Sequence, residues 1–426
     1  MSPTQTPPRS SYPGPTDALP SRTRLAAGLG AAVSAVSRRL GRGSGSVIGG
    51  RAILAVDPRA LDRLAAGHDV ALVSGTNGKT TTTSLLAAAL ATAGPVVTNL
   101  QGANLPQGLA SALAAGPRGA PAALEVDEAW LGQVVAATAP RAVALLNLSR
   151  DQLDRNNEVR TLASAWRRIF VDRPGVTVVA NADDPLVVWG AGTAADVRWV
   201  GAGQPWTEDA GGCPRCGGRI DFADASGSGW ACRDCELSRP SLDVRLRPGR
   251  IEWKDGSGMD LDLKLPGRAN QANATMALVV ATVFGVERDR ALAAVNGLSE
   301  VVGRYAVVRS GAVRARLLLA KNPAGWLEVF DFLAPPPRPV VVAINARIAD
   351  GRDPSWLWDV PFEKLRGRLV VATGERSRDL AVRLRYAEVE HLHEPDLIRA
   401  LAASGAPDVD VVANYTSFQQ LRARLS

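Results

Sequence analysis

The stretch VSGTNGKTTTTS, residues 73–84, decides how the rest of this sequence is interpreted. Its Gly-Lys-Thr triplet (78–80) is the end of a phosphate-binding loop, but Val73 stands where the usual loop G-x-x-x-x-G-K-[ST] has its first glycine. The apolar run 69–73 predicts a buried strand, and residues 79–91 predict a helix. A strand, a glycine turn and a helix N-terminus direct free backbone N–H groups toward one point, where a phosphate can bind.

Two side chains of this stretch suit a nucleotide. The Lys79 ammonium would contact β- and γ-phosphate oxygens, and the Thr80 hydroxyl would be a ligand of Mg²⁺. The alternative is a chance Gly-Lys-Thr in a turn between a strand and a helix. Because the strand, the turn, the lysine and the threonine occur together, we favour a nucleotide site that is built differently from the common loop.

The composition describes a globular chain of 426 residues with 46% hydrophobic and 21% charged residues, long enough for two or three domains. No apolar run reaches the roughly 20 residues of a membrane span. Residues 1–22 are rich in Pro, Ser and Thr and predict a disordered leader. Residues 23–42 lack the long apolar core of a signal peptide and predict an amphipathic surface helix, packed on the first domain. The net charge of +7 fits anionic partners: nucleotide, pyrophosphate, anionic lipid or nucleic acid.

The four cysteines form one pattern, Cys213-x₂-Cys216 and, fifteen residues later, Cys232-x₂-Cys235. This spacing is typical of a tetrahedral zinc site, and four thiolates leave no open coordination position, so the predicted role of the zinc is structural. Two disulfides are the alternative, which nucleotide chemistry in a reducing compartment disfavours. A nucleic-acid-binding zinc ribbon is a further alternative, but residues 211–240 lack a basic surface with aromatic side chains.

The remaining chain alternates strand and helix signals, which predicts parallel sheets with helices on both faces. Polar clusters follow three of the predicted strands, at 125–128, 147–155 and 181–185. Ligands of such sheets bind at the carboxyl ends of the strands, so these clusters and the glycine turn predict one shared site. The predicted strands are 121–126, 141–148, 176–180, 338–344, 368–373 and 409–413, and helices are predicted at 157–170 and 268–284.

These motifs resemble those of the Mur ligase family. GTNGKTTT (75–82), NLSRDQLDR (147–155), NADDP (181–185), LPGRANQANA (265–274), GR (303–304) and AKNPAG (320–325) occur in the order and spacing of that family. The family builds its ATP loop as GT[NK]GKT, which explains the missing first glycine, and the resemblance extends from about residue 48 to the C-terminus. It implies an α/β protein with a central ATP-binding domain at 23–302 on a mostly parallel sheet, a zinc ribbon inserted at about 205–240, and a Rossmann-like C-terminal domain at 303–426.

Within the family, three features are similar to the MurT-type subunit of lipid II isoglutaminyl synthase. They are the four-cysteine insert, Gln152 in place of the histidine of amino-acid-adding members, and the segment ADGRDPSWLWDVPFEKL at 349–365. Two departures stand beside them. No lysine lies between Lys79 and Lys254, so the carbamylated lysine at the metal site of amino-acid-adding members is absent. Residues 346–347, Ala-Arg, replace an Asp-Asn pair that is usual in MurT-type proteins.

The resemblance implies roles for individual residues. Lys79 would bind the β/γ-phosphates and Thr80 the Mg²⁺. Glu125 is the first choice for a further Mg²⁺ ligand, and Glu128 is the second. For Asp184 the alternative is a plain N-cap of a helix that begins at the following proline, and Asn273 could merely satisfy a helix start. The residues implied in ATP binding are Gly75, Thr76, Asn77, Gly78, Lys79, Thr80, Thr81, Asn181, Asp184, Asn270, Asn273 and Arg304.

The reaction implied by the resemblance is amide formation. ATP would convert the α-carboxylate of the D-glutamate in the lipid II stem peptide to an acyl phosphate, and ammonia would displace the phosphate to give D-isoglutamine. The protein would act at the cytoplasmic face of the cell membrane, where its lipid substrate is. Three rival functions stay open: a Mur- or folylpolyglutamate-like amino-acid ligase, a nucleic-acid-binding ATPase that uses the zinc ribbon, and a subunit with a vestigial ATP site.

The source of ammonia points to a partner. Many glutaminases use a Cys-His-acid triad, but the four cysteines are assigned to zinc and the three histidines lie outside every motif. The resemblance implies a GatD-like glutamine amidotransferase as the second subunit, with Asp353 completing its triad. Trp356 and Trp358 could anchor that interface. The alternative is that Asp353 is only the N-cap of a helix beginning at Pro354.

Overall fold

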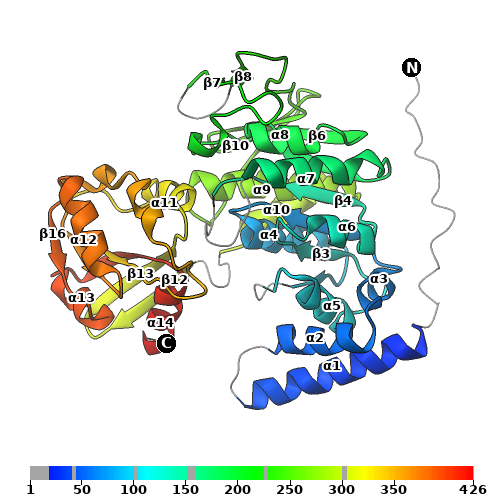
Figure 1. The fold of residues 1–426 in the computed structure, drawn as a ribbon, viewed down its shortest axis with the longest axis horizontal. Helices are drawn as coiled ribbons and strands as arrows, with labels where there is room; N and C mark the ends of the chain where they lie inside the picture. Colours follow the sequence, from blue (N-terminus) through cyan, green and yellow to red (C-terminus); the bar gives the residue numbers. More distant parts are fainter. Residues whose placement is uncertain are drawn as a thin grey trace.

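The computed structural model describes residues 19–40, 45–99, 103–150, 159–224, 229–299 and 305–425. These residues form a nine-stranded sheet, a six-stranded sheet and a separate two-stranded hairpin. Figure 1 shows the six-stranded sheet and its helices as a distinct body beside the larger one. The three polar strand ends that the sequence singles out follow β3, β4 and β5, which all belong to the nine-stranded sheet.

The larger sheet is a parallel sheet extended by an antiparallel edge. Its strands follow the order β11-β10-β9-β6-β5-β4-β1-β3-β2, and all neighbours from β9 to β2 are parallel. Strands β9, β10 and β11 form two antiparallel pairs at one edge. The bounds are β1 Val70–Ser74, β2 Val97–Thr98, β3 Ala122–Glu125, β4 Ala142–Leu145, β5 Thr177–Asn181, β6 Asp196–Gly201, β9 Val244–Arg247, β10 Arg250–Trp253 and β11 Gly258–Asp260.

Both faces of this sheet are covered, which explains why its central strands are apolar throughout. Side chains of β1 alternate between the faces, so Val70 and Leu72 pack in one core and Ala71 and Val73 in the other. Helices α4 Lys79–Ala91, α9 Arg268–Val283 and α10 Arg288–Gly297 cover the second face. The first face is covered by α3 Ala60–Ala65, α5 Pro106–Ala115, α6 Leu131–Thr138, α7 Val159–Val171 and α8 Pro185–Ala191.

Two N-terminal helices pack beneath this body, as Figure 1 shows. Helix α1 spans Ser21–Arg39 and α2 spans Ser46–Val56, and α1 contacts α2, α3 and α5. The surface helix predicted at 23–42 and packed on the first domain is therefore confirmed within the described residues, although it begins two residues earlier. Of the predicted leader only residues 19–22 are described, and α1 takes up its last two residues. None of the helices in the described ranges is long and apolar enough to cross a membrane.

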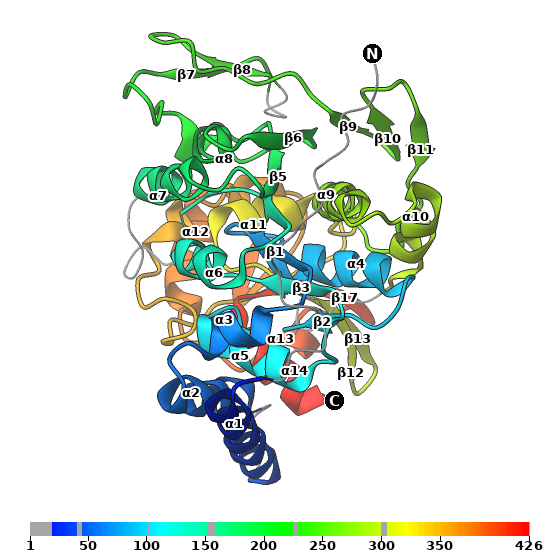
Figure 2. The same cartoon turned by 90° about the vertical axis from the view of Figure 1, so that its right-hand side faces the viewer.

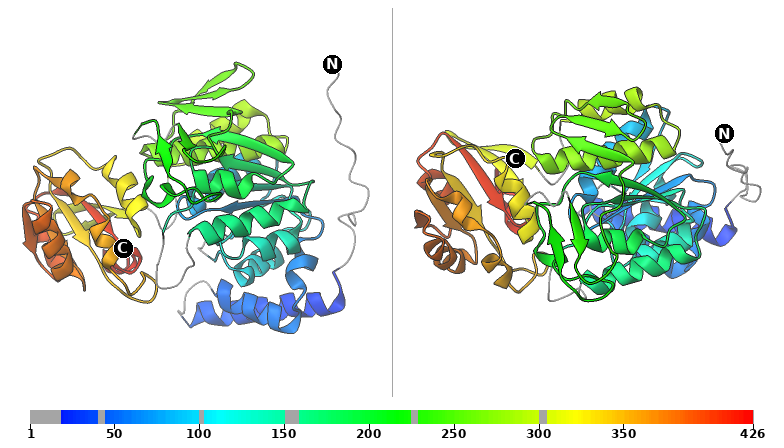
Figure 3. Two further views of the ribbon diagram at one scale, coloured as in Figure 1. Left: turned by 45° about the horizontal axis from the view of Figure 1, so that its top comes forward. Right: turned by 90° about the horizontal axis from the view of Figure 1, so that it is seen from above.

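The smaller sheet has the order β12-β13-β17-β14-β15-β16, and only the β12–β13 pair is antiparallel. Helices lie on both of its faces, with Trp326 and Phe362 buried on one and Phe418 on the other. Figures 2 and 3 show this body from other sides. Its elements are β12 Tyr305–Ser310, β13 Val313–Leu319, α11 Pro323–Phe330, β14 Val340–Ala343, η2 Ser355–Trp358, η3 Phe362–Leu365, β15 Val370–Thr373, α12 Ser377–Tyr386, β16 His391–His393, α13 Leu397–Ala403, β17 Asp408–Ala413 and α14 Tyr415–Leu425. The α/β class with mostly parallel sheets is confirmed.

Candidate active site

The phosphate loop lies between the carboxyl end of β1 and the N-terminus of α4. Gly78 is the residue before α4 and has φ 84°, a left-handed conformation that favours glycine. A Cβ at this position would lie 2.4 Å from Asn273 Oδ1, so a side chain is also excluded by α9. Asn147, after β4, accepts hydrogen bonds from the Thr76 and Asn77 backbone N–H groups. The loop is thus held from two sides.

Lys79, the first residue of α4, is nearly buried and turned back over the loop. Its Nζ donates to the carbonyls of Gly75 at 2.5 Å and Thr76 at 3.3 Å, and it lies 3.1 Å from Glu128 Oε2. The Lys79 and Glu128 side chains are 5% and 11% exposed. Glu128, the second choice for a metal ligand, is therefore the counter-ion of the loop lysine.

Thr80 meets the carboxyl end of β3 on the other side of the loop. Its Oγ1 donates to Glu125 Oε2 at 2.8 Å, and Asn104 Nδ2 lies 3.5 Å from Glu125 Oε1. Asn99 fixes the backbone beneath, since its amide donates to the Glu125 carbonyl and accepts from the Glu125 N–H, both at 2.8 Å. A hydroxyl and a carboxylate on fixed backbones are the hard oxygen donors that Mg²⁺ prefers, so these residues fit the implied metal.

Asp127 adds a second acid at this strand end. Burial raises the pKa of the Asp127 carboxyl, the neighbouring Glu128 raises it further, and Lys79 lowers it. The end of β3 next to the phosphate loop thus combines the ammonium group of one lysine with several carboxyl groups. The lysine can leave its carboxylate partner to bind a phosphate, and the carboxylate can then bind a metal ion.

A cleft runs from the loop along α9 to the smaller sheet. Its lining includes Asn77, Gly78 and Thr81 from the loop and its helix, and Asn270 and Asn273 from α9. The facing wall comes from the smaller body: Leu318, Leu319, Ala320, Lys321, Gly325, Glu328, Val329 and Phe332. The structure therefore brings both of the predicted α9 asparagines to the cleft beside the loop. Asn270 also donates to the Pro266 carbonyl at 2.6 Å.

The cleft continues into a second hollow at the carboxyl ends of β4, β5 and β6. Asn181, Gln204, Arg268 and Asn273 are among its lining residues. Asn181 Oδ1 accepts from the Asp183 N–H at 3.0 Å, which turns the chain at this strand end. Asn273 lines both hollows, so it connects the loop to the Asn181 side of the cleft.

Asp184 lies beneath this hollow and is fully buried. Its Oδ1 accepts from the N–H groups of Leu186 and Val187 at the start of α8, and Oδ2 accepts from the Leu148 N–H at 2.8 Å. Burial raises the pKa of the Asp184 carboxyl to about 6, against the three backbone hydrogen bonds that lower it. Asp184 therefore makes the N-cap contacts of α8, and its predicted nucleotide contact stays a prediction.

Sequence reasoning did not assign Lys321 and Asn322, although their motif AKNPAG was recognised. Both follow β13 in the smaller body, and Lys321 lines the wall opposite the loop. Asn322 Nδ2 donates to Asn77 Oδ1 at 3.2 Å, a contact between residues 245 positions apart. A polar strand end directly before a Pro-containing helix start was the signal, the same one that marked 181–185.

Asp353 lies near this junction, on the exposed surface of the smaller body. A small hollow contains Asp353, Asp359 and Trp356 together with Arg150, Lys321 and Asn322. Asp353 Oδ1 accepts from the Ser355 N–H at 2.9 Å. The helix that follows is the 3₁₀ helix η2, beginning at Ser355 rather than Pro354, so Asp353 caps a turn and not an α-helix. One of its carboxylate oxygens makes that bond, and the side chain stays accessible.

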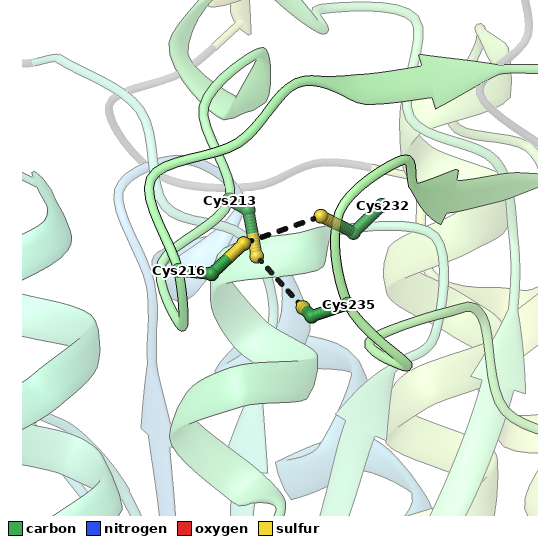
Figure 4. Close-up of side chains that lie close together, drawn as sticks. All are labelled: Cys213, Cys216, Cys232 and Cys235. Atoms are coloured by element: carbon green, nitrogen blue, oxygen red, sulfur yellow. Dashed lines mark hydrogen bonds between the residues drawn. The ribbon is translucent and has the colours of Figure 1, made fainter.

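The four cysteines converge at the end of the hairpin β7 Ile220–Phe222 and β8 Trp230–Cys232 (Figure 4). All four sulfur atoms lie within 4.8 Å of one another. The Cys213–Cys235 and Cys216–Cys232 sulfur separations are 3.7 and 3.5 Å, close to the ~3.8 Å edge of a tetrahedron with Zn–S bonds of ~2.3 Å. Backbone N–H groups of Gly218 and Asp234 point at two of the sulfurs. The donor set fits zinc.

The zinc ribbon is fastened to the loop that carries Asn181. Trp230 Nε1 donates to the Ala182 carbonyl at 3.0 Å, and the ring packs with Cys213 and Val188. Arg239, near the C-terminal end of the ribbon, pairs with the fully buried Asp183 at 2.5 Å. The ribbon therefore braces the far wall of the cleft. Two residues from the sequence analysis, Gln152 and Arg304, lie outside the described residues.

Comparisons with known proteins agree with this geometry. The profile of the Mur ligase middle domain matches residues 73–205, and that of the MurT ligase C-terminal domain matches residues 319–418. The lipid II isoglutaminyl synthase (glutamine-hydrolyzing) subunit MurT of Streptococcus pneumoniae is 28% identical, over 92% of this chain and 94% of that protein. The Staphylococcus aureus subunit of the same name is also 28% identical, over the same shares.

Solved structures show the same fold. A pseudomurein peptide ligase type C from Methanothermus fervidus superimposes with a TM-score of 0.68 at 18% identity, covering 84% of this chain and 78% of that one. MurF from Acinetobacter baumannii superimposes with a TM-score of 0.61 at 16% identity, covering 88% and 80%. The motifs, the fold and the two profile matches all lead to one assignment. The chain belongs to the Mur ligase family, as a MurT-like member.

Proposed function

We propose that this protein is the ligase subunit of a glutamine-hydrolysing lipid II isoglutaminyl synthase. It converts the α-carboxyl of D-glutamate in the lipid II stem peptide to an amide, at the inner face of the cell membrane, and consumes ATP. The observation on which the proposal depends most is the cleft between the loop and Lys321, which joins a complete phosphate site to a MurT-like C-terminal body. The resemblance to MurT over nearly the whole chain supplies the substrate.

The residues of the cleft have distinct tasks in this reaction. Residues 75–81 hold the triphosphate through backbone N–H groups at the start of α4. Lys79 leaves Glu128 and contacts the transferring phosphoryl group, where it stabilises the charge that develops. Thr80 and Glu125 would hold Mg²⁺, which when bound neutralises phosphate oxygens. Asn181, Asn270 and Asn273 line the path toward the nucleoside.

The second step uses ammonia. A carboxylate does not react with ammonia, so its activation as an acyl phosphate provides a leaving group. Ammonia then attacks the acyl carbon, phosphate departs, and the amide remains. Lys321 lines both the cleft and the small hollow that contains Asp353, so ammonia released at that hollow would reach the acyl phosphate past this residue.

We assign the release of ammonia to a partner subunit, a GatD-like glutamine amidotransferase. The chain has no cysteine outside the ribbon, so it lacks the nucleophile of a glutaminase triad. Asp353 is exposed and shares its hollow with Trp356, and Trp358 on the same 3₁₀ helix is 55% exposed. A carboxylate in that place would orient the partner's histidine and stabilise its charged form. The proposed enzyme also requires a structural zinc in the ribbon and Mg²⁺ at the phosphate loop.

The proposal is tested by reconstitution. The full chain, a glutamine amidotransferase subunit, lipid II, Mg²⁺, ATP and glutamine are combined, and the stem peptide is analysed by mass spectrometry. We expect conversion of one carboxyl to an amide, with release of ADP and phosphate. Addition of a whole amino acid in place of the amide would overturn the proposal in favour of a peptide-extending ligase. ATP binding without any modification of lipid II would favour a vestigial site.

A further inference from the structure

Helix α1 turns its larger apolar side chains away from the protein. The exposed ones are Leu25 (69% exposed), Leu29 (46%), Val36 (55%) and Leu40 (64%), the last being the C-cap residue; we call these four residues the α1 stripe. The buried ones are small or polar: Thr23, Ala26, Gly30, Ser34 and Ser37. A surface helix of a globular protein ordinarily shows the opposite arrangement, with its large apolar residues in the core.

The inner face of α1 is already anchored, so the α1 stripe is not needed to hold the helix. A Cβ at Gly30 would lie 2.4 Å from Ile53 Cγ1, which shows how closely α1 approaches α2. Thr23 Oγ1 donates to Asp57 Oδ2 at 2.6 Å, and Arg22 Nε donates to the Val56 carbonyl at 2.7 Å. The helix therefore keeps one fixed orientation, with the α1 stripe directed outward.

The charged residues around the α1 stripe are all basic. From Leu19 to Val56 the sequence contains no Asp or Glu, whereas Arg22, Arg24, Arg38, Arg39 and Arg51 all lie on α1 or α2. All five arginines are exposed. In Figures 1 and 2, α1 forms the lower margin of the molecule, and α2 lies between it and the rest. The outer side of α1 is thus apolar, basic and accessible.

We propose that α1 docks this protein on an anionic lipid bilayer. The α1 stripe enters the boundary between headgroups and acyl chains, and the flanking arginines contact lipid phosphates, as in other amphipathic helices that lie in the membrane plane. Nineteen residues give α1 a length of roughly 28 Å along the surface. The inference rests on the proposed function in one respect, because that function requires the enzyme to meet a lipid-anchored acceptor.

A bilayer fits these observations better than an acidic protein partner. A lipid surface accepts any spacing of leucines and arginines, whereas a protein partner requires a shaped apolar face. The α1 stripe extends from the second turn of the helix to its C-cap, so its apolar side chains are spread along the helix and are not gathered at one anchor position. Binding should depend on both components, since apolar burial alone or charge alone gives only weak association.

The test is co-sedimentation of the full chain with vesicles. We expect binding to vesicles of phosphatidylcholine mixed with phosphatidylglycerol and little binding to phosphatidylcholine alone. The double variant Leu25→Gln, Leu29→Gln should bind at least about tenfold less, and Arg24→Gln, Arg39→Gln should lose most of the preference for the anionic lipid. All four side chains are exposed, so circular dichroism and thermal unfolding should be unchanged.

Matched controls come from the smaller body. Val382 and Leu392 are exposed to similar extents, 49% and 46%, and their double change to Gln should leave vesicle binding as it is. The proposal would be overturned if the Leu25→Gln, Leu29→Gln variant bound vesicles as well as the wild type does. It would also be overturned if this variant lost binding to the glutaminase subunit and kept binding to vesicles. Vesicle binding is measured without catalysis, so its result tests the membrane-docking proposal separately from the proposed amidation reaction.

Discussion

Thr80 Oγ1 donates a hydrogen bond to Glu125 Oε2 over 2.8 Å, although 45 positions separate the two residues. The pair joins the first turn of α4 to the carboxyl end of β3, both of which are fixed by parallel pairing of β1 with β3. A hydroxyl and a carboxylate at this distance can turn toward one metal ion without moving the backbone. If the two side chains hold Mg²⁺ as proposed, this preorganisation would place its ligands before nucleotide arrives.

The first prediction concerns this pair. Glu125→Gln should raise the Mg²⁺ concentration needed for half-maximal ATP turnover and lower the turnover by ~100-fold or more, because it removes the ligand charge but keeps the shape. Steady-state phosphate release measured across a Mg²⁺ titration checks it. Glu128→Gln is the matched control, since it removes an acid from the same strand end. An equal or larger shift of the Mg²⁺ requirement in the control would transfer the metal-ligand role to Glu128, whereas a loss of turnover without that shift would reflect its pairing with Lys79.

The loop lysine provides the second prediction. Lys79→Ala should leave the fold intact and lower ATP turnover by orders of magnitude, because charge on the transferring phosphoryl group loses its stabilisation. The change also leaves Glu128 without its counter-ion, so a double variant Lys79→Ala, Glu128→Gln separates the two effects. If the double variant regains stability but not turnover, the lysine acts on the phosphate. Near-normal amidation by Lys79→Ala would contradict its assigned role.

The third prediction concerns zinc. Elemental analysis of protein purified after a chelator wash should give about one zinc per chain, bound by the four cysteines. Cys232→Ser should lower the zinc content and, because the ribbon is fastened to Ala182 through Trp230, weaken nucleotide binding as measured by calorimetry. Ser164→Ala, on α7 and away from both the ribbon and the phosphate loop, serves as a reference for unspecific loss. A metal-free chain with an intact ribbon and unchanged nucleotide affinity would refute the zinc assignment.

Asp353 is the subject of the fourth prediction. Asp353→Asn keeps the acceptor for the Ser355 N–H and nearly the same shape, but it removes the negative charge. In the complex with the glutaminase subunit, glutamine-dependent amidation should fall at least ~100-fold, and amidation with added ammonium should persist. Asp359→Asn, in the same small hollow, is the control. Unchanged glutamine hydrolysis in Asp353→Asn would reduce this residue to a turn cap.

A pH dependence of stability follows from Asp184. Burial raises the pKa of its carboxyl from 3.8 to about 6 in the folded protein, so the folded state binds this proton more tightly than the unfolded chain. The resulting stabilisation is complete below about pH 3.8 and is lost as the pH rises through about 6. Relative to Asp184→Asn, the free energy of unfolding of the wild type should fall by up to ~3 kcal/mol between these limits. Urea unfolding at several pH values measures the difference, and a constant difference would contradict the shifted pKa.

The sequence predicted the most apolar parallel strands, because burial on both faces leaves them apolar, but it missed β6 and β13, which contain arginines. Strands 141–148 and 409–413 were found from such runs and correspond to β4 and β17. Strands β9 and β10 were missed, since VRLR and RIEW alternate apolar and charged residues at a solvated sheet edge and contain no continuous apolar run. A period of two with Pro-Gly between them was the available signal.

For the site, the sequence located residues but not their contacts. The cysteine ligands and the loop follow from local spacing, so they were predictable. The pairs Lys79–Glu128 and Asn322–Asn77 depend on how strand ends and two sheets are placed in space, which local patterns do not encode. Asp184 had two compatible interpretations in the sequence, because an N-cap and a ligand contact use the same residue type at the same place.

The hydrogen bond between Asn322 and Asn77, and the ion pair of Arg150 with Asp359 at 3.5 Å, cross between the two bodies at the cleft. A nucleotide bound in the cleft as proposed would contact both bodies at this joint. A partner that binds the smaller body and changes its position at the cleft would therefore change the affinity for ATP. By thermodynamic reciprocity, ATP would change the affinity for that partner by the same factor. The joint would in this way couple nucleotide binding to partner binding.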